Sequence, residues 1–235
     1  ILDTLDGVKK QLDEMKATSE RYSLYKSLFN DTPEDWKSLK EAYDEYSLRK
    51  DIWQSLYQFE ELTEQWDNTD KDDLDGPNIE DQVNEFFKIS HKLHRKANGD
   101  DITTHLKNKV KIRRDCMPIV LMISNKDMQT KHWQQIFKGM NQVFIKNSTY
   151  TLRNLSTLGI YGQKDLVSNV SAMASGEADL VKMLDQIETL WRDCEFSTKP
   201  YRDYRNTFII GSVEEVMQLL EDHQVQILYW VVVQD

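Results

Sequence analysis

An apolar pattern with helical spacing runs from residue 33 to about residue 66. Its positions are Trp36, Leu39, Tyr43, Tyr46 and Trp53, with Ile52, Leu56, Phe59, Leu62 and Trp66 drifting off the stripe. Because apolar residues at three- and four-residue steps share one face of an α-helix, the pattern predicts a single helix of roughly 34 residues. At 1.5 Å per residue it is about 50 Å long. Such a helix suits a rod or a wall of an elongated bundle better than a compact domain.

The same spacing predicts helices in most of the remaining chain. The expected helices cover residues 2–29, 79–97, 102–124, 129–143, 163–192 and 212–228. Thr32, Asn78 and Ser212 have the features of N-caps, with Pro33 at the first helical position after Thr32. A proline inside a helix removes a backbone hydrogen bond, so a kink or a restart is expected at Pro118.

Two segments depart from the helical period. Residues 147–162 are polar and contain Gly159 and Gly162, so we expect a loop with a short apolar piece. Alternating apolar residues on both sides of residues 199–203 indicate a β-hairpin. The predicted fold class is therefore mainly α, an elongated bundle of long helices with one small β-hairpin near the C-terminus.

The charge of the chain is concentrated at one end. Residues 1–75 hold 20 acids and 10 bases, whereas residues 76–235 hold 20 of each, which leaves the net charge at −10. The densest acidic stretch, residues 67–75, precedes Gly76 and Pro77 and is typical of a solvated linker. We expect three parts: an acidic long-helix hairpin over residues 1–75, a helical subdomain with the proline kink over 76–162, and a long helix, β-hairpin and C-terminal helix over 163–235.

Several classes of function are disfavoured by this composition. An acidic chain is a poor general binder of nucleic acid. The longest apolar runs are far shorter than the roughly 20 residues of a membrane span, so no membrane partner is expected. Two cysteines allow no disulfide framework and no zinc ribbon. No glycine-rich phosphate-binding motif occurs, so the prediction is that this chain is not an enzyme and holds no cofactor or metal.

Two clusters leave alternatives open. His91, His94 and Cys116 are candidates for a metal site or a nucleophile pair, although exposed polar histidines explain them as well. Residues 88–114 hold nine Lys or Arg and two Asp, a net charge of +7, centred on Lys107, Lys109, Lys111, Arg113 and Arg114. This basic stretch is either a solvated face, or it docks against the acidic first third of the chain or against an acidic partner.

Large aromatic residues are spread along the predicted helices. The 6 tryptophans lie at positions 36, 53, 66, 133, 191 and 230. Spaced in this way, such side chains usually fix one helix to its neighbours, which is an architectural role.

A series of short motifs resembles the linker region of dynein heavy chains. In order they are Asp51-Ile52-Trp53, Cys116-Met117-Pro118-Ile119, Ser124-Asn125, Lys131-His132-Trp133, Ala174-Ser175-Gly176-Glu177 and Trp191. The matched positions Trp53, Pro118, His132, Trp133, Glu177 and Trp191 are expected to be structural. The sequence departs from the family at Gly176, which weakens a helix by about 1 kcal/mol relative to Ala, and in the apolar run over residues 227–235.

The resemblance implies a mechanical role. In dyneins the linker is a helical lever that swings over a ring of AAA+ ATPase modules and drives minus-end-directed movement along microtubules. The resemblance implies that ATP and magnesium bind only in the parent motor. The implied partners are the AAA+ ring of the same heavy chain, dynein intermediate and light chains, and microtubules. The implied location is the cytoplasm and cytoskeleton, in particular the ciliary or flagellar axoneme. Candidate hinges are residues 67–77, Pro118 and residues 147–162.

The main alternative is a protein of another class. A free-standing helical adaptor or scaffold would bind partners through its acidic helices, residues 1–66. The chain opens at Ile1 and not at Met. We therefore expect a piece of a longer polypeptide, which favours the lever over the adaptor.

Overall fold

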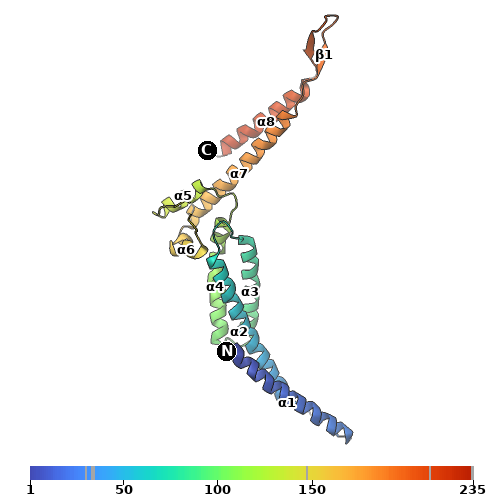
Figure 1. Cartoon of the computed structure of the whole chain (residues 1–235), viewed down its shortest axis with the longest axis vertical. Coiled ribbons are helices and arrows are strands. Elements are labelled where there is room, and N and C mark those ends of the chain that lie inside the picture. Colours follow the sequence, from blue (N-terminus) through green and yellow to red (C-terminus); the bar gives the residue numbers. More distant parts are fainter. Residues whose placement is uncertain (30, 33–34, 147, 212, 234–235) are drawn as a thin grey trace.

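The computed structural model shows an elongated molecule built almost entirely of helices (Figure 1). It describes residues 1–29, 31–32, 35–146, 148–211 and 213–233, with only the backbone for 230–233. The elements in order are α1 (Leu2–Leu28), α2 (Lys37–Asn68), α3 (Gly76–Lys96), α4 (Asp101–Ile123), α5 (Thr130–Gly139), α6 (Leu152–Thr157), η1 (Ile160–Gly162), α7 (Lys164–Arg192), β1 (Thr198–Pro200), β2 (Phe208–Ile210) and α8 (Glu214–Val233). The predicted fold class is confirmed.

The α1–α2 hairpin forms one end of the molecule and the β-hairpin forms the other (Figure 1). The Tyr43 hydroxyl donates a hydrogen bond to Asp13 Oδ1 (2.7 Å), and Trp36 Nε1 donates one to Ser23 Oγ (3.2 Å), so polar contacts join the two helices. Of the described α1 side chains, only Leu12 and Ser19 are buried. Most of α1 is therefore a solvated arm along α2.

Two of the three predicted N-caps are wrong. The helix α2 begins at Lys37, because Asp35 and Trp36 are not helical, so Thr32 does not cap it. Pro33, Glu34 and Ser212, which belonged to the predicted helix starts, lie outside the described residues. The start of α3 is capped by Asp75, whose Oδ1 accepts a hydrogen bond from the Asn78 backbone N–H (3.2 Å). Asn78 is thus the donor of this cap and not the capping residue.

One buried core joins α2 to the first half of α7. Its residues run from Ile52 to Val170, and Phe59 packs against Trp66 and Phe86 with ring centroids 6.1 and 5.3 Å apart. The core crosses both expected part boundaries. The three-part division of the chain stays a prediction, because a shared core does not say how the parts move.

The acidic stretch after α2 is not a solvated linker. Leu74 is only 1% exposed and belongs to the core. Its neighbours bind the segment before α6: the Lys71 backbone N–H donates to the Tyr150 carbonyl (2.9 Å), and the Tyr150 N–H donates to Asp70 Oδ2 (2.9 Å). The buried Leu74 and these hydrogen bonds together hold the stretch against the protein.

The segment 147–162 also differs from the expected loop. It contains α6, capped by Thr151, whose hydroxyl accepts a hydrogen bond from the Asn154 N–H (3.3 Å), and the turn η1. Leu152, Leu155 and Ile160 are buried in the core. Six residues of helix are too few to show a period in the sequence.

The helix α4 runs without interruption through Pro118, which rules out the restart, whereas the alternative, a kink, stays a prediction. Pro118 lies on the exposed side of the helix. Pro118 has no backbone N–H to donate to the carbonyl of Arg114, one turn earlier in the helix.

Part of the basic stretch docks onto the acidic first third, as one of the alternatives expected. Lys109 pairs with Glu60, and Arg113 Nη2 lies 2.8 Å from Asp67 Oδ1. A third pair has its base on α2 and its acid at the start of α4: Arg49 Nη1 lies 3.1 Å from Asp100 Oδ2. These pairs bind α2 to the α3–α4 pair.

The helix α7 leaves the core half-way along its length. Its buried residues are Val167, Val170, Ser171 and Ala174. Leu184 continues the apolar seam of the helix from Val170, at seven-residue steps, but is 46% exposed. Beyond the core, β1 and β2 pair antiparallel with Thr198 opposite Ile210, which confirms the predicted hairpin. In Figure 1, α8 folds back beside α7. Among the described residues, no helix is both long and apolar enough to cross a membrane.

Candidate functional site at the junction of α5 and α7

His132 lies on the first turn of α5 and is 1% exposed. Its Nδ1 accepts a hydrogen bond from the Gln129 backbone N–H (3.0 Å). In a neutral imidazole one ring nitrogen accepts and the other carries the proton, so the proton is on Nε2. That nitrogen lies 3.1 Å from Glu177 Oε2 of α7. The side chain thus completes the start of α5 and presents a polar N–H to α7.

A lysine of the same helix also contacts Glu177. Lys131 Nζ lies 2.5 Å from the same Oε2 atom. The hydrogen bond from Lys131 lowers the pKa of the Glu177 carboxyl, and the charge of Lys131 acts in the same direction. The carboxylate is therefore ionised at neutral pH and links two successive residues of α5 to α7.

Close backbone packing accompanies this polar link. A Cβ atom built on Gly139, at the end of α5, would collide with the Leu166 side chain of α7. The neighbouring Trp133 is 3% exposed, and Lys71 from the loop after α2 lies over its ring, with Nζ 5.4 Å from the centroid. The helix α5 is therefore held between α7 and the loop after α2.

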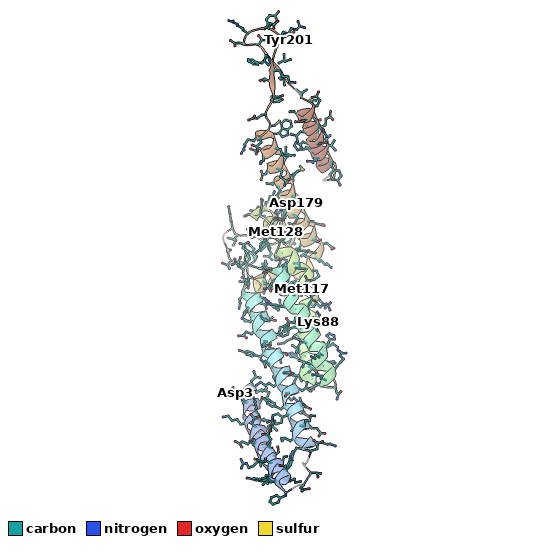
Figure 2. All side chains as sticks on the ribbon, turned by 90° about the vertical axis from the view of Figure 1, so that its right-hand side faces the viewer. Asp3, Lys88, Met117, Met128, Asp179 and Tyr201 are labelled. Carbon is teal, nitrogen blue, oxygen red and sulfur yellow. The ribbon has the colours of Figure 1, made fainter. Side chains whose placement is uncertain are left out.

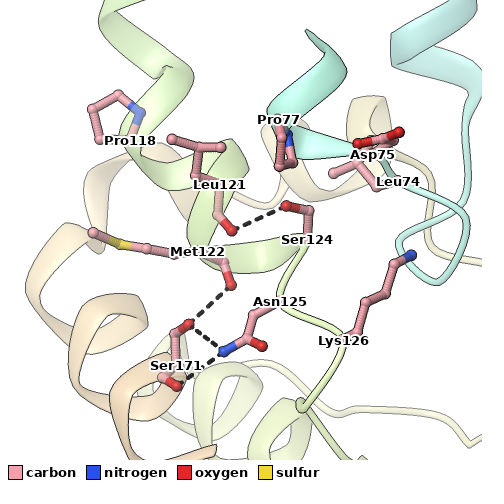
Figure 3. Close-up of a pocket in the computed structure, with 10 residues that line it drawn as sticks. All are labelled: Leu74, Asp75, Pro77, Pro118, Leu121, Met122, Ser124, Asn125, Lys126 and Ser171. Atoms are coloured by element: carbon pink, nitrogen blue, oxygen red, sulfur yellow. Dashed lines mark hydrogen bonds between the residues drawn. The ribbon is translucent and has the colours of Figure 1, made fainter. Parts of the chain in front are cut away.

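Asn125 makes a second polar link to α7, just after the end of α4 (Figure 3). Its Nδ2 donates to Ser171 Oγ (3.0 Å) and lies 2.9 Å from Ser175 Oγ. Ser171 Oγ in turn donates to the Met122 carbonyl (3.1 Å). The buried Ser171 thus satisfies a carbonyl at the end of α4, and Asn125 links that end to both serines.

A groove of about 660 Å³ lies beside this network (Figure 3). Its lining residues are Leu74, Asp75, Pro77, Pro118, Leu121, Met122, Ser124, Asn125, Lys126 and Ser171. Ser124 Oγ donates to the Leu121 carbonyl (3.0 Å), and Lys126 Nζ donates to the Asp72 carbonyl (2.8 Å). These polar groups are used in hydrogen bonds within the protein. The groove is therefore a packing gap between neighbouring elements and offers these groups to no ligand.

The expected structural positions fall into separate places. His132, Trp133 and Glu177 meet at the α5–α7 junction, and Pro118 lines the groove nearby. Trp53 packs half-buried against the core from α2. Trp191 lies at the far end of α7, where its Nε1 donates to His223 Nδ1 of α8 (2.9 Å).

Three contributors to the junction were not anticipated as such. Lys71 was read only as part of a charged linker, and Ser171 and Ser175 carried no role. The signal available for the serines was a pair of small polar residues four apart on the apolar side of a predicted helix. The sequence indicates Gly76 only as the residue that follows a charged linker. A Cβ there would collide with Ser124 Oγ, so the start of α3 and the end of α4 touch at this glycine.

The candidate enzyme residues have different surroundings. His91 Nδ1 lies 2.9 Å from the Phe87 carbonyl of its own helix, and His94 Nδ1 lies 3.2 Å from Thr103 Oγ1. Cys116 lines another pocket, and burial raises the pKa of its thiol, which disfavours a thiolate nucleophile. In the part of the chain that the structure describes, no group of three or more histidine, cysteine or acidic residues could hold a metal ion.

Comparison with known proteins shows the family of this chain. A family model described as dynein heavy chain, N-terminal region 2, matches residues 39–229. This chain belongs to that family. The matched range includes all the expected structural positions, from Trp53 on α2 to Trp191 at the end of α7, and it confirms the resemblance to dynein heavy chains.

Individual dynein heavy chains match nearly the whole length of this chain. Human dynein axonemal heavy chain 6 is 25% identical over 224 residues, and human dynein axonemal heavy chain 17 is 26% identical over 224 residues. The ciliary dynein beta chain of Heliocidaris crassispina is 25% identical over 223 residues. Each match covers 95% of this chain and 5% of the relative, so the chain spans about one twentieth of the length of these proteins.

Proposed function

We propose that this segment of a dynein heavy chain is a mechanical lever that transmits the movement of an ATPase motor. The observation that carries the proposal is the single core from Ile52 to Val170, which binds helices from α2 to α7 into one elongated body. A lever must be stiff along most of its length, with bending confined to a few residues. The match to the N-terminal region of dynein heavy chains indicates that such a body would belong to a dynein motor.

The partners and location follow from the same proposal. The lever would work against the AAA+ ring of its own heavy chain, where ATP and magnesium would bind and be hydrolysed. Intermediate and light chains and microtubules would be met through the parent complex. Axonemal and ciliary relatives support a place in the axoneme. The family match favours this role over that of a free-standing adaptor.

Two of the three candidate hinges are tied to each other. The Leu152 N–H donates to the Thr69 carbonyl (3.1 Å), next to the bridge between Asp70 and Thr151. Bending at residues 67–77 or 147–162 would have to break these contacts. We therefore propose that bending occurs instead in α7 just beyond Glu177, which is tied to Lys131 and His132 of α5. Gly176, the residue before Glu177, lowers the local stability of the helix.

Fluorescent labels in a complete dynein heavy chain test the lever. One label is placed in the β-hairpin loop at Asp203 and the other in an ATPase module. The distance between them is expected to differ between ATP-bound and nucleotide-free motors. Equal distances in both states would contradict the proposal.

A second pair of labels tests where bending occurs. Labels at Lys138 on α5 and at Asp203 lie on opposite sides of the proposed bend, and their separation is expected to change with nucleotide. Labels at Lys88 and Lys138, both on the core side, are the control and should keep a constant separation. A constant separation for both pairs would show that the segment swings as one body, without a bend just beyond Glu177.

A further inference from the structure

The α3–α4 pair carries basic residues other than Lys109 and Arg113, the two that pair with α2. Five of them are Lys88 and Arg95 on α3, and Lys107, Lys111 and Arg114 on α4. Lys107, Lys111 and Arg114 follow each other at four- and three-residue steps, so they share one side of α4. Figure 2 labels Lys88 on this helix pair, midway along the molecule. We call these five residues the basic face.

The basic face differs from the basic residues that bind α2. Lys109 and Arg113 are used inside the molecule, on Glu60 and Asp67. Within the described residues, no ion pair is formed by any of the five side chains of the basic face. In a chain with a net charge of −10, five cations without acidic partners on one surface are a local exception.

Arg114 is held in place without a carboxylate. Its guanidinium carbon lies 4.0 Å from the centroid of the Phe87 ring, and the His91 ring lies against the same phenylalanine, with centroids 4.1 Å apart. Stacking on an aromatic face orders the planar guanidinium while leaving its N–H groups available. Such an ordered fork is suited to bind a carboxylate through two parallel hydrogen bonds.

We propose that the basic face is a docking surface for an acidic protein segment, rich in Asp and Glu. Charge complementarity carries this assignment, since the surface offers an ordered guanidinium and four ammonium or guanidinium groups within two adjacent helices. A long nucleic acid fits less well, because it would extend beyond the five cations towards α1 and α2, where residues 1–75 hold 20 acids and 10 bases. This surface is distinct from the α5–α7 junction, and the proposal does not depend on the lever role.

Binding of a fluorescein-labelled oligoglutamate peptide to the full 235-residue chain tests the proposal. The triple variant Lys107→Glu, Lys111→Glu, Arg114→Glu is expected to bind at least about tenfold more weakly. The control variant Lys138→Glu, Lys146→Glu, Lys164→Glu changes the net charge equally, at exposed cations outside the basic face, and should change the affinity by less than about twofold. Equal losses in the two variants would overturn the proposal, because long-range charge alone would then explain binding.

Further measurements distinguish a direct contact with the peptide from repulsion by the introduced glutamates, and an acidic peptide from other polyanions. The neutral triple variant Lys107→Gln, Lys111→Gln, Arg114→Gln should also lose affinity, and its circular dichroism should match that of the unmodified chain. Arg114→Lys keeps the positive charge but removes the planar guanidinium with its two parallel N–H donors. This variant should therefore bind the peptide more weakly than the unmodified chain. Failure of oligoglutamate to bind, or tighter binding of polyuridylate or of phosphatidylserine vesicles, would overturn the assignment to an acidic protein segment.

Discussion

His132 Nε2 and Glu177 Oε2 lie 3.1 Å apart and join α5 to α7 beside the point where α7 leaves the core. Both residues belong to motifs that resemble those of dynein linkers, and the fold brings them together. Since His132 also completes the start of α5 through its Nδ1, one buried side chain couples the two helices. The link is therefore expected to hold the direction of α7 relative to the core.

Replacing His132 tests how much this link stabilises the fold. His132→Ala removes a side chain that is 1% exposed and leaves the Gln129 N–H without its acceptor. The free energy of unfolding, measured by urea denaturation, should fall by about 2–4 kcal/mol. His105→Ala, at an exposed position of α4, is the control and should change it by less than about 0.5 kcal/mol. Similar small values for both variants would show that the junction is not a structural link.

Glu177 gives the junction a dependence on pH. The Lys131 hydrogen bond lowers the pKa of this carboxyl from its ordinary value of 4.5. A carboxylate with a lowered pKa in the folded state adds stability that is fully present above the ordinary value and is lost as the pH falls through the lowered value. The difference in unfolding free energy between the unmodified chain and Glu177→Gln should therefore shrink as the pH falls below 4.5.

The matched control for this pH dependence is Glu221→Gln. Glu221 is exposed on α8, and none of the ion pairs of the described residues involves it. Chemical denaturation at a series of pH values should show a constant, small difference for this variant. A difference for Glu177→Gln that stayed constant with pH would rule out the ion pair as its source.

Two glycines should respond to alanine in opposite ways. At Gly76 an added Cβ would collide with Ser124 Oγ and lie 3.3 Å from Leu121 Cα, so Gly76→Ala should destabilise the fold by about 1–3 kcal/mol. At Gly7, inside α1, nothing lies within 4 Å of an added Cβ. Gly7→Ala should stabilise α1 by about 0.5–1 kcal/mol, because alanine is the better helix former. Thermal unfolding followed by circular dichroism measures the change in stability of each variant. A gain in stability in both variants would contradict the packing at Gly76.

Trp191 should control the docking of α8. Trp191→Phe removes the N–H that donates to His223 Nδ1, and His223 is only 7% exposed. An unpartnered buried nitrogen costs about 1–3 kcal/mol, so backbone amides of α8 should exchange hydrogen faster while those of α2 stay protected. Trp36→Phe, which removes the exposed bond to Ser23, should leave exchange in α8 unchanged. Unaltered exchange of α8 in Trp191→Phe would show that other contacts hold it.

Local patterns in the sequence predict most of the fold, and non-local packing accounts for what they miss. The helix over residues 163–192 and the hairpin after it are read correctly because period and turn residues are local properties. Burial is not local: Leu184 continues the apolar seam of α7 but is exposed, since no described element covers it as the core covers Val170. Leu74 shows the converse, one apolar residue buried within an acidic stretch.

The candidate site was predictable only in part, for the same reason. The motifs containing His132 and Glu177 were recognised one by one, but their contact depends on how α5 packs on α7. Gly139 permits that packing, and nothing in its sequence context indicates Leu166 as its neighbour. Ser124-Asn125 is one of the motifs that resemble the dynein linker, whereas the bonds of Asn125 to Ser171 and Ser175 follow from the tertiary fold.

The most direct test of the lever compares movement with ATP turnover in a complete dynein heavy chain that carries this segment. The double variant His132→Ala, Glu177→Gln loosens the α5–α7 junction, and no phosphate-binding motif of this segment is altered, since none occurs. The account predicts slower microtubule gliding at a retained rate of ATP hydrolysis. Gliding at the unmodified speed, with the junction shown to be weakened by urea denaturation, would contradict the claim that this body transmits the stroke.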